Sequence, residues 1–213
     1  MSILWVLPIV YLLYTAVRVT PDTGIINTLI PDDLQLGFGN FTRLFRDTMF
    51  SKWLGNTLLV ASVSCLVTTL FVLMVSYALS RLRFKLRKPI MNVLLVLGMF
   101  PGFMSMIAIY FILKAMGLTN SLFALILVYL GGAALNYYIC KGFFDTIPKS
   151  LEEAAILDGA SQIRVFFAIT VPMSKPIIIY TILTSFISPW CDFIFVNTII
   201  NDREKYTVAL GLY

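Results

Sequence analysis

The sequence predicts an all-α polytopic membrane protein, and three observations lead to that fold class. Of the 213 residues, 59% are hydrophobic and 13% are charged, against about 45–50% and about 25% in soluble domains. The mean hydropathy is +0.90. Five stretches are apolar and close to the length of about 20 residues that a membrane-spanning helix needs. So few charges could not cover a soluble globule, and so much apolar content excludes a disordered chain.

The same composition excludes several chemistries. The chain has no histidine, which excludes Ser-His-Asp triads, histidine-ligated metals and histidine proton switches. Cys65, Cys140 and Cys191 lie far apart in apolar stretches and fit no metal or redox spacing, so we interpret them as buried thiols. No G-x-x-x-x-G-K-[ST] motif occurs, so the chain carries no P-loop. We therefore expect a protein that binds no metal or cofactor.

The apolar stretches predict the order of elements along the chain. Residues 1–19 are expected to form the first transmembrane helix, and 20–53 a polar extracytoplasmic loop. Residues 54–213 are expected to form a core in which the remaining four spans cover 54–80, 89–113, 121–140 and 176–196. Within this core, a tight turn at 114–120 follows the second of these spans, and 141–175 is the longest polar stretch.

Basic residues predict the orientation. Segment 81–88, RLRFKLRK, has five Lys or Arg and no acid, which equals the net charge of +5. Loop 141–175 carries further basic residues, and loops two connections apart lie on the same side. Because Lys and Arg are enriched in cytoplasmic loops, both segments and the N-terminus are predicted to be cytoplasmic. We attribute 81–88 to contact with anionic lipid rather than to nucleic-acid binding. Tyr213 then lies outside, and we expect that a sixth helix is missing from this chain.

The loop 141–175 contains the most specific pattern. Ser150-x-x-Glu153 predicts a capping box that opens a helix at Leu151, and Gly159 is placed to end this helix. Ser161 can cap a second helix over 162–170, which Pro172 would end. The first helix has a small Ala/Gly face that another surface could approach closely. From the residues alone, a plain helical connection lying on the headgroups remains the alternative.

This loop resembles the EAA-motif signature, E-A-A-x-x-D-G-A followed by I-x-x-P, of permease subunits of bacterial ABC importers. The matching segments are Glu153-Ala154-Ala155, Asp158-Gly159-Ala160 and Ile169 to Pro172. Val171 departs from the pattern, since the family usually has Leu there. Further segments resemble the MalG-type subunit of maltose/maltodextrin importers: 129–132, 141–147, 150–155 and 203–212.

The resemblance implies a MetI-like permease fold, normally of six helices, in a bacterial inner (plasma) membrane. It implies that the loop helix is a coupling helix docking on a cytoplasmic ATPase. ATP hydrolysis would belong to that partner, and this chain would be a non-catalytic membrane subunit, not an enzyme. The coupling residues would be Glu152, Glu153, Ala154, Ala155, Asp158, Gly159 and Ala160. The implied partners are a second, MalF-type permease forming a heterodimer, an ATP-binding subunit dimer, an extracytoplasmic solute-binding protein and a sugar.

Polar and helix-breaking residues inside the spans are candidates for the translocation path. They are Pro101, Gly102, Asn136, Tyr137, Trp190 and Asp192. An intramembrane carboxylate is expensive and often functional, and a proline kink can line a pathway. The alternatives are a packing bend, an interfacial aromatic anchor and a helix-stabilising contact. A carrier or channel that does not use ATP and an importer of a non-sugar solute remain the alternative functions.

Overall fold

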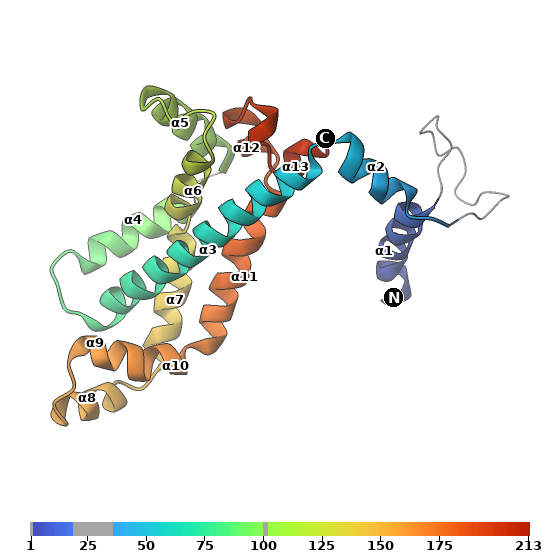
Figure 1. Ribbon diagram of the computed structural model, residues 1–213. Coiled ribbons are helices and arrows are strands. Elements are labelled where there is room, and N and C mark those ends of the chain that lie inside the picture. The colour runs from blue at the N-terminus through green and yellow to red at the C-terminus, as the bar shows by residue number, and fades with distance from the viewer. Residues whose placement is uncertain (1, 19–35, 100–101) are drawn as a thin grey trace. The chain divides into compact units, whose positions relative to one another are not determined.

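The computed structural model describes residues 2–18, 36–99 and 102–213 (Figure 1). The chain forms two compact units, Met1–Lys52 and Trp53–Tyr213. Every regular element in the described part is a helix, apart from an isolated bridge between Arg18 and Leu36. The all-helical prediction is thus confirmed. Of the predicted path residues, Pro101 lies outside the described residues.

The first unit holds two helices, α1 (Ser2–Val17) and α2 (Gly39–Asp47). The side-chain amide of Asn40 donates hydrogen bonds to the carbonyls of Ala16 and Arg18, at 3.2 and 2.8 Å. The predicted first span corresponds to α1. At 16 residues, this helix is shorter than the length of about 20 residues that crosses a bilayer without tilt.

The second unit is built on α3 (Phe50–Arg81), a helix of 32 residues that begins just before the unit. The long helices that follow are α4 (Arg87–Met99), α5 (Gly102–Ala115), α6 (Leu122–Gly131), α7 (Ala134–Thr146) and α11 (Lys175–Cys191). The shorter helices are α8 (Lys149–Leu157), α9 (Gln162–Val165), the π-helical η1 (Phe166–Thr170), α10 (Val171–Met173), α12 (Ile194–Ile199), the 3-10 helix η2 (Arg203–Lys205) and α13 (Val208–Gly211).

The spans beyond α3 are interrupted. The division of 89–113 falls beside Gly102, where the sequence predicts a kink, whereas the other interruptions correct the prediction of continuous helices. Residues 89–113 are divided between α4 and α5, and the stretch 121–140 bends by 43° between α6 and α7. The bend falls at Gly132, and glycine is a poor helix former. The last span ends at Cys191 and not at Val196. By length and composition, α3 alone among the described helices can cross a membrane, and the number reaches four if each bent pair is one span.

The coupling loop also differs in detail from the prediction. Helix α8 begins at Lys149 with Pro148 as its N-cap and no side-chain capping bond, so the predicted capping box is wrong. Ser150 already lies within the first turn, two residues too late to cap. Gly159 follows the helix with φ +87°, and Ser161 Oγ accepts from the Arg164 amide, as predicted. The second helix continues through Pro172 to Met173, because proline is tolerated in the first turn of α10.

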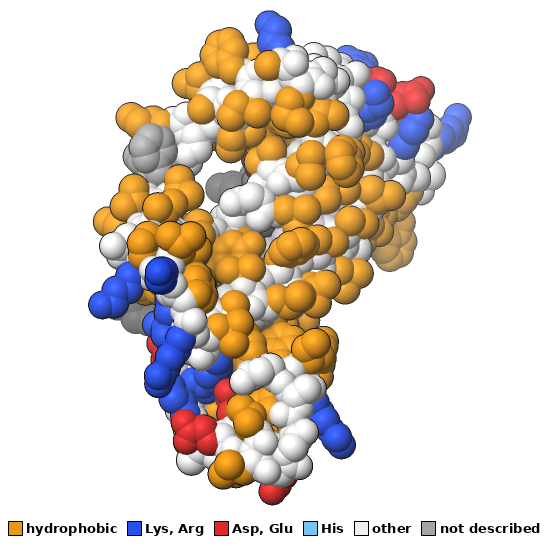
Figure 2. All heavy atoms as spheres, turned by 90° about the vertical axis from the view of Figure 1, so that its left-hand side faces the viewer, with side chains coloured by type: hydrophobic (Ala, Val, Ile, Leu, Met, Phe, Trp, Pro, Cys, Tyr) orange, Lys and Arg blue, Asp and Glu red, His pale blue; other side chains and the backbone are white. Residues whose placement is uncertain are grey.

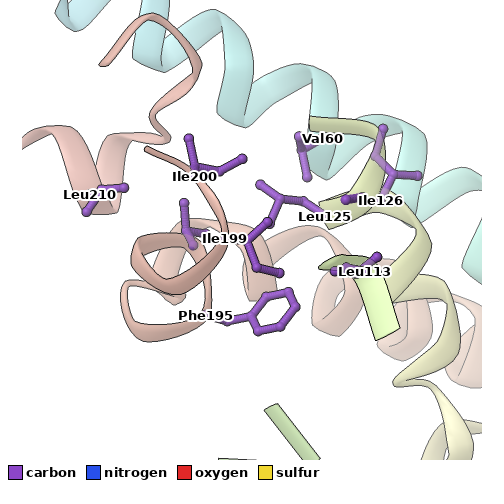
Figure 3. Packing of buried hydrophobic residues seen from close by; sticks show 10 residues of the cluster. Val60, Leu113, Leu125, Ile126, Phe195, Ile199, Ile200 and Leu210 are labelled. Atoms are coloured by element: carbon purple, nitrogen blue, oxygen red, sulfur yellow. The ribbon is translucent and has the colours of Figure 1, made fainter. Parts of the chain in front are cut away.

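Two apolar clusters hold the second unit together. The first joins α3, α5, α6, α12 and α13 around Val60, Leu125 and Ile199 (Figure 3). The second joins α3, α7, η1 and α11 around Val72, Phe144 and Phe166. Figure 1 shows α8, α9 and α10 at one end of the unit and α12 and α13 at the other. Figure 2 shows a broad apolar belt across the face it presents, with charged side chains towards its ends.

The segment after α12 folds back onto the beginning of α3. Trp53 Nε1 donates to the Arg203 carbonyl at 2.9 Å, and the Val208 amide donates to Thr57 Oγ1 at 2.8 Å. The Asn56 amide group donates to the carbonyls of Glu204 and Tyr206, at 2.8 and 2.9 Å. These side chains satisfy backbone groups of the final segment that no regular helix would pair.

Candidate functional site

The two neighbouring acids of α8 lie in opposite environments. Glu152 is buried, whereas Glu153 is exposed. Successive residues of a helix are rotated by about 100° because a turn takes about 3.6 residues. The Glu152 carboxylate therefore faces the interior of the second unit, and the Glu153 carboxylate lies on the outer side of α8.

Glu152 forms a buried ion pair with Arg81, the last residue of α3. Arg81 Nε lies 2.9 Å from Glu152 Oε1, and the two side chains are only 5% and 7% exposed. Thr170 Oγ1 donates to the same oxygen at 3.0 Å, and Arg81 Nη2 donates to the Ile147 carbonyl at 3.0 Å. The pair thus joins the end of α3, the α7–α8 connection, α8 and η1. We name it the α3–α8 joint.

The α3–α8 joint corrects the interpretation of segment 81–88. Arg81 was expected to contact lipid with its neighbours, but its guanidinium is committed to Glu152 and Ile147. The residues that remain exposed at the end of the unit are Arg83, Lys85 and Lys88. Two further bonds reinforce the same region: Ser80 Oγ to Asp145 Oδ1 at 2.7 Å and Tyr77 OH to Gln162 Oε1 at 3.1 Å.

The outer side of α8 presents the small residues of the EAA motif. Ala154, Asp158 and Gly159 are exposed, while Ala155 and Ala160 are half-buried. A hollow of about 290 Å³ is lined by Ala155, Asp158, Ala160, Arg164, Val165, Ala168 and Ile169. A Cβ at Gly159 would meet no atom within 4 Å. The hollow thus lies beside the small residues of the motif and is closed on its other side by residues of α9 and η1.

A second site lies within the helices, between the two apolar clusters. It is a cavity of about 800 Å³, at the upper part of the range typical of ligand pockets. Its walls come from α3, α5, α6, α7 and α11 and from the segment that leads into α12. The lining residues are Thr68, Gly102, Met106, Val128, Tyr129, Gly132, Ala133, Asn136, Thr184, Ser185, Ser188, Cys191, Asp192, Phe193, Ile194 and Phe195.

Asp192 has two protein partners in this cavity. Tyr129 OH donates to Oδ2 at 2.9 Å, and the Phe195 amide donates to Oδ1 at 3.1 Å. The second bond caps the start of α12, where the last span is interrupted. The carboxylate thus stabilises a helix and also lines the cavity. A helix-stabilising contact and a place in the translocation path are therefore compatible for Asp192.

The structure brings some of the predicted path residues together and separates others. Gly102, Asn136 and Asp192 line the cavity. Trp190 does not line it and packs against Phe186, with ring centroids 6.1 Å apart. Tyr137 packs against the second apolar cluster.

Several residues of these sites could not be selected from the sequence. Tyr129, Thr68 and Ser185 are ordinary residues of apolar helices, and Arg81 is one of five neighbouring basic residues. Tyr129 is distinguished only by its place in segment 129–132, which resembles a permease segment. Among the described residues, no three His, Cys, Asp or Glu side chains are placed to share a metal ion.

Comparison with known proteins identifies the class of molecule. Residues 72–212 match the family described as binding-protein-dependent transport system inner membrane component. The match covers most of the chain, so the chain belongs to this family of membrane proteins. In this family the membrane component is not catalytic, and separate subunits hydrolyse ATP. The predicted resemblance to ABC importer permeases is thereby confirmed.

Three relatives illustrate the similarity. The galactooligosaccharides transport system permease protein GanQ of Bacillus subtilis is 36% identical over 212 residues, which are 96% of this chain and 74% of that protein. The maltodextrin transport system permease protein MalD of Streptococcus pneumoniae is 34% identical, covering 84% and 65%. The maltose/maltodextrin permease protein MalG of Escherichia coli K12 is 33% identical, covering 75% and 56%.

The chain spans only part of these relatives, as those shares show. Among solved structures, a chain of a bacterial ABC transporter that imports the acidic polysaccharide alginate superposes with a TM-score of 0.83. The superposition covers 96% of this chain and 71% of that one at 22% identity. At that identity the likeness concerns the fold alone.

Proposed function

We propose that the chain is the transmembrane permease subunit of an ATP-driven sugar importer, with maltodextrin-type oligosaccharides favoured. The observation that carries the proposal is the family match over 72–212, a range that contains α8 and every residue that lines the cavity except Thr68. The substrate class is supported by the relatives, whose names specify galactooligosaccharides and maltodextrins. The chain would sit in the bacterial cell membrane with its N-terminus in the cytoplasm.

In this proposal α8 is the coupling helix. Its outer residues, Ala154, Ala155, Asp158, Gly159 and Ala160, would receive a cytoplasmic ATPase at the hollow beside α9, and Glu153 would supply a polar contact. Glu152 would act from within, by holding α8 against α3 through Arg81. A displacement of α8 on ATP binding would then reach α3 directly, since the two helices share this buried pair.

The remaining parts of the importer would be separate chains. A second permease would complete the translocation path, to which the cavity around Asn136 and Asp192 contributes. An extracytoplasmic binding protein would deliver the sugar. ATP binding and hydrolysis would bias inward- and outward-facing states through different contacts at α8.

The variant Ala155→Trp tests the coupling role. The indole would fill the hollow, so we expect the ATPase to be lost when the tagged chain is purified from its host membrane. Uptake of radiolabelled maltotriose should fall about tenfold or more, since about 1.4 kcal/mol of lost docking energy is a tenfold loss of affinity. Leu86→Trp is the matched control, because Leu86 is exposed on segment 81–88 outside the hollow.

The coupling role would be abandoned if Ala155→Trp kept both the co-purified ATPase and the uptake. Uptake that survives removal of ATP in the unmodified protein would favour a carrier or channel.

A further inference from the structure

Two hydroxyl groups in the wall of the cavity have no hydrogen-bond partner among the described residues. They are Thr68 Oγ1 on α3 and Ser185 Oγ on α11. Thr68 is only 3% exposed. Buried polar groups in native structures are almost always paired, so each exception asks for an explanation.

Other hydroxyls of the same two helices differ in their bonding: Ser64 and Thr69 of α3 also lack a partner among the described residues, and neither lines the cavity. Thr57 of α3 donates to the Trp53 carbonyl one turn earlier, and Thr181 of α11 donates to the Ile177 carbonyl, each at 2.9 Å. Neither Thr57 nor Thr181 lines the cavity. Thr68 and Ser185 line the cavity, and their hydroxyl groups make no such bond. Their hydrogen-bonding capacity is therefore unused by the described residues.

Among the described residues, the cavity wall carries acidic but no basic side chains. Asp192 is the one acidic residue among the described lining residues, and no Lys or Arg is among them. A carboxylate has about four acceptor positions, and the bonds from Tyr129 and the Phe195 amide occupy two. Asp192 can therefore accept further hydrogen bonds from a ligand hydroxyl, while a ligand carboxylate nearby would meet like charge in a low-dielectric site.

We propose that this cavity is a binding subsite, within this chain, for uncharged sugar rings. Thr68 and Ser185 hydrogen-bond the sugar hydroxyls, and Asp192 accepts from them and excludes sugars that carry carboxylates. The inference rests on the proposed importer function and assigns specificity residues to it. It also distinguishes this chain from its structural neighbour, a transporter involved in the import of the acidic polysaccharide alginate.

The test uses the importer complex purified through a tag on this chain, with its partner subunits, in lipid nanodiscs without nucleotide. Equilibrium dialysis measures binding of radiolabelled maltotriose and of trigalacturonate, an acidic trisaccharide of the same length. The unmodified complex should bind maltotriose at least tenfold more tightly than trigalacturonate. In the double variant Thr68→Val/Ser185→Ala, maltotriose affinity should fall about tenfold. Its melting temperature should not fall, because these hydroxyls make no hydrogen bond with any residue that the structure describes.

Two further variants sharpen the result. Thr181→Val is the matched control, since its hydroxyl is bonded within α11 and it lines no part of the cavity; maltotriose binding should stay unchanged. Asp192→Asn keeps groups that can pair with Tyr129 and cap α12 but removes the charge. We expect its trigalacturonate affinity to rise about tenfold while maltotriose affinity changes much less.

Unchanged maltotriose affinity in Thr68→Val/Ser185→Ala would overturn the subsite. Equal binding of the two trisaccharides by the unmodified complex would overturn the charge selection. Either result would leave the importer function standing if cells still take up maltotriose with ATP. Loss of the importer function itself would appear separately, as the absence of ATP-driven sugar uptake in the unmodified protein.

Discussion

Glu152→Ala is expected to destabilise the protein strongly, whereas Glu153→Ala next to it is expected to have little effect. Removing the Glu152 carboxylate leaves the Arg81 guanidinium buried without its counter-charge. Breaking a buried pair in this way typically costs about 3–5 kcal/mol. Glu153 is exposed, and surface substitutions usually stay within about 0.5 kcal/mol. Thermal unfolding of the purified complex, followed by intrinsic fluorescence, compares the two variants.

The double variant Arg81→Met/Glu152→Leu tests whether the loss of stability in Glu152→Ala comes from the unpaired Arg81 charge. Replacing both partners of a buried ion pair by apolar residues is often neutral or stabilising, so much of the lost stability should return. Uptake should not return fully if the α3–α8 joint also transmits motion from α8. Equal melting temperatures for Glu152→Ala and Glu153→Ala would contradict the buried pair.

Gly211→Ala is expected to disrupt the packing of the final segment on α3. A Cβ at this position would overlap with Cδ2 and Cε3 of the Trp53 ring. The indole cannot easily withdraw, because its Nε1 donates to the Arg203 carbonyl and its side chain is buried. Overpacking of this kind typically costs about 1–3 kcal/mol. The same thermal unfolding measurement detects the loss.

Gly55→Ala is the matched control at the same end of α3. A Cβ there meets nothing within 4 Å, and alanine in a helix interior is more favourable than glycine by roughly 0.5–1 kcal/mol. The two glycine variants should therefore shift stability in opposite directions. Combining Gly211→Ala with Trp53→Leu should restore part of the loss, since the smaller side chain removes the clashing ring atoms. A Gly211→Ala protein as stable as the unmodified one would argue against the observed contact with Trp53.

Much of the fold follows from local signals, as individual elements show. The 32-residue helix α3 comes from an apolar stretch without proline. Gly159 ends α8 in a left-handed conformation, and Ser161 caps α9, because each depends on the chain within a few residues of it. The EAA motif was likewise recognisable, since its residues are adjacent. The interruptions near Gly132 and Asp192 were missed, because apolar composition alone does not show where a span bends.

Which of the two acids of α8 faces inward depended on tertiary packing. Neighbouring residues of a helix point about 100° apart, so only one of them can meet the core, and Glu152 is the one that reaches Arg81 and Thr170. The capping-box pattern pointed to Glu153, and no local pattern distinguishes the two acids.

The sequence by itself determined that this is a helical membrane protein of the importer-permease family, because composition, hydropathy and a contiguous motif are properties of neighbouring residues. Only the tertiary structure decided that Arg81 pairs with Glu152, 71 residues away. It also decided that Tyr129 bonds Asp192 in a cavity whose wall includes Thr68 and Ser185. Such contacts arise from the packing of helices that are distant in sequence. Hydrophobic periodicity indicates which face of a helix is buried, but it does not indicate which polar groups on different helices form hydrogen bonds.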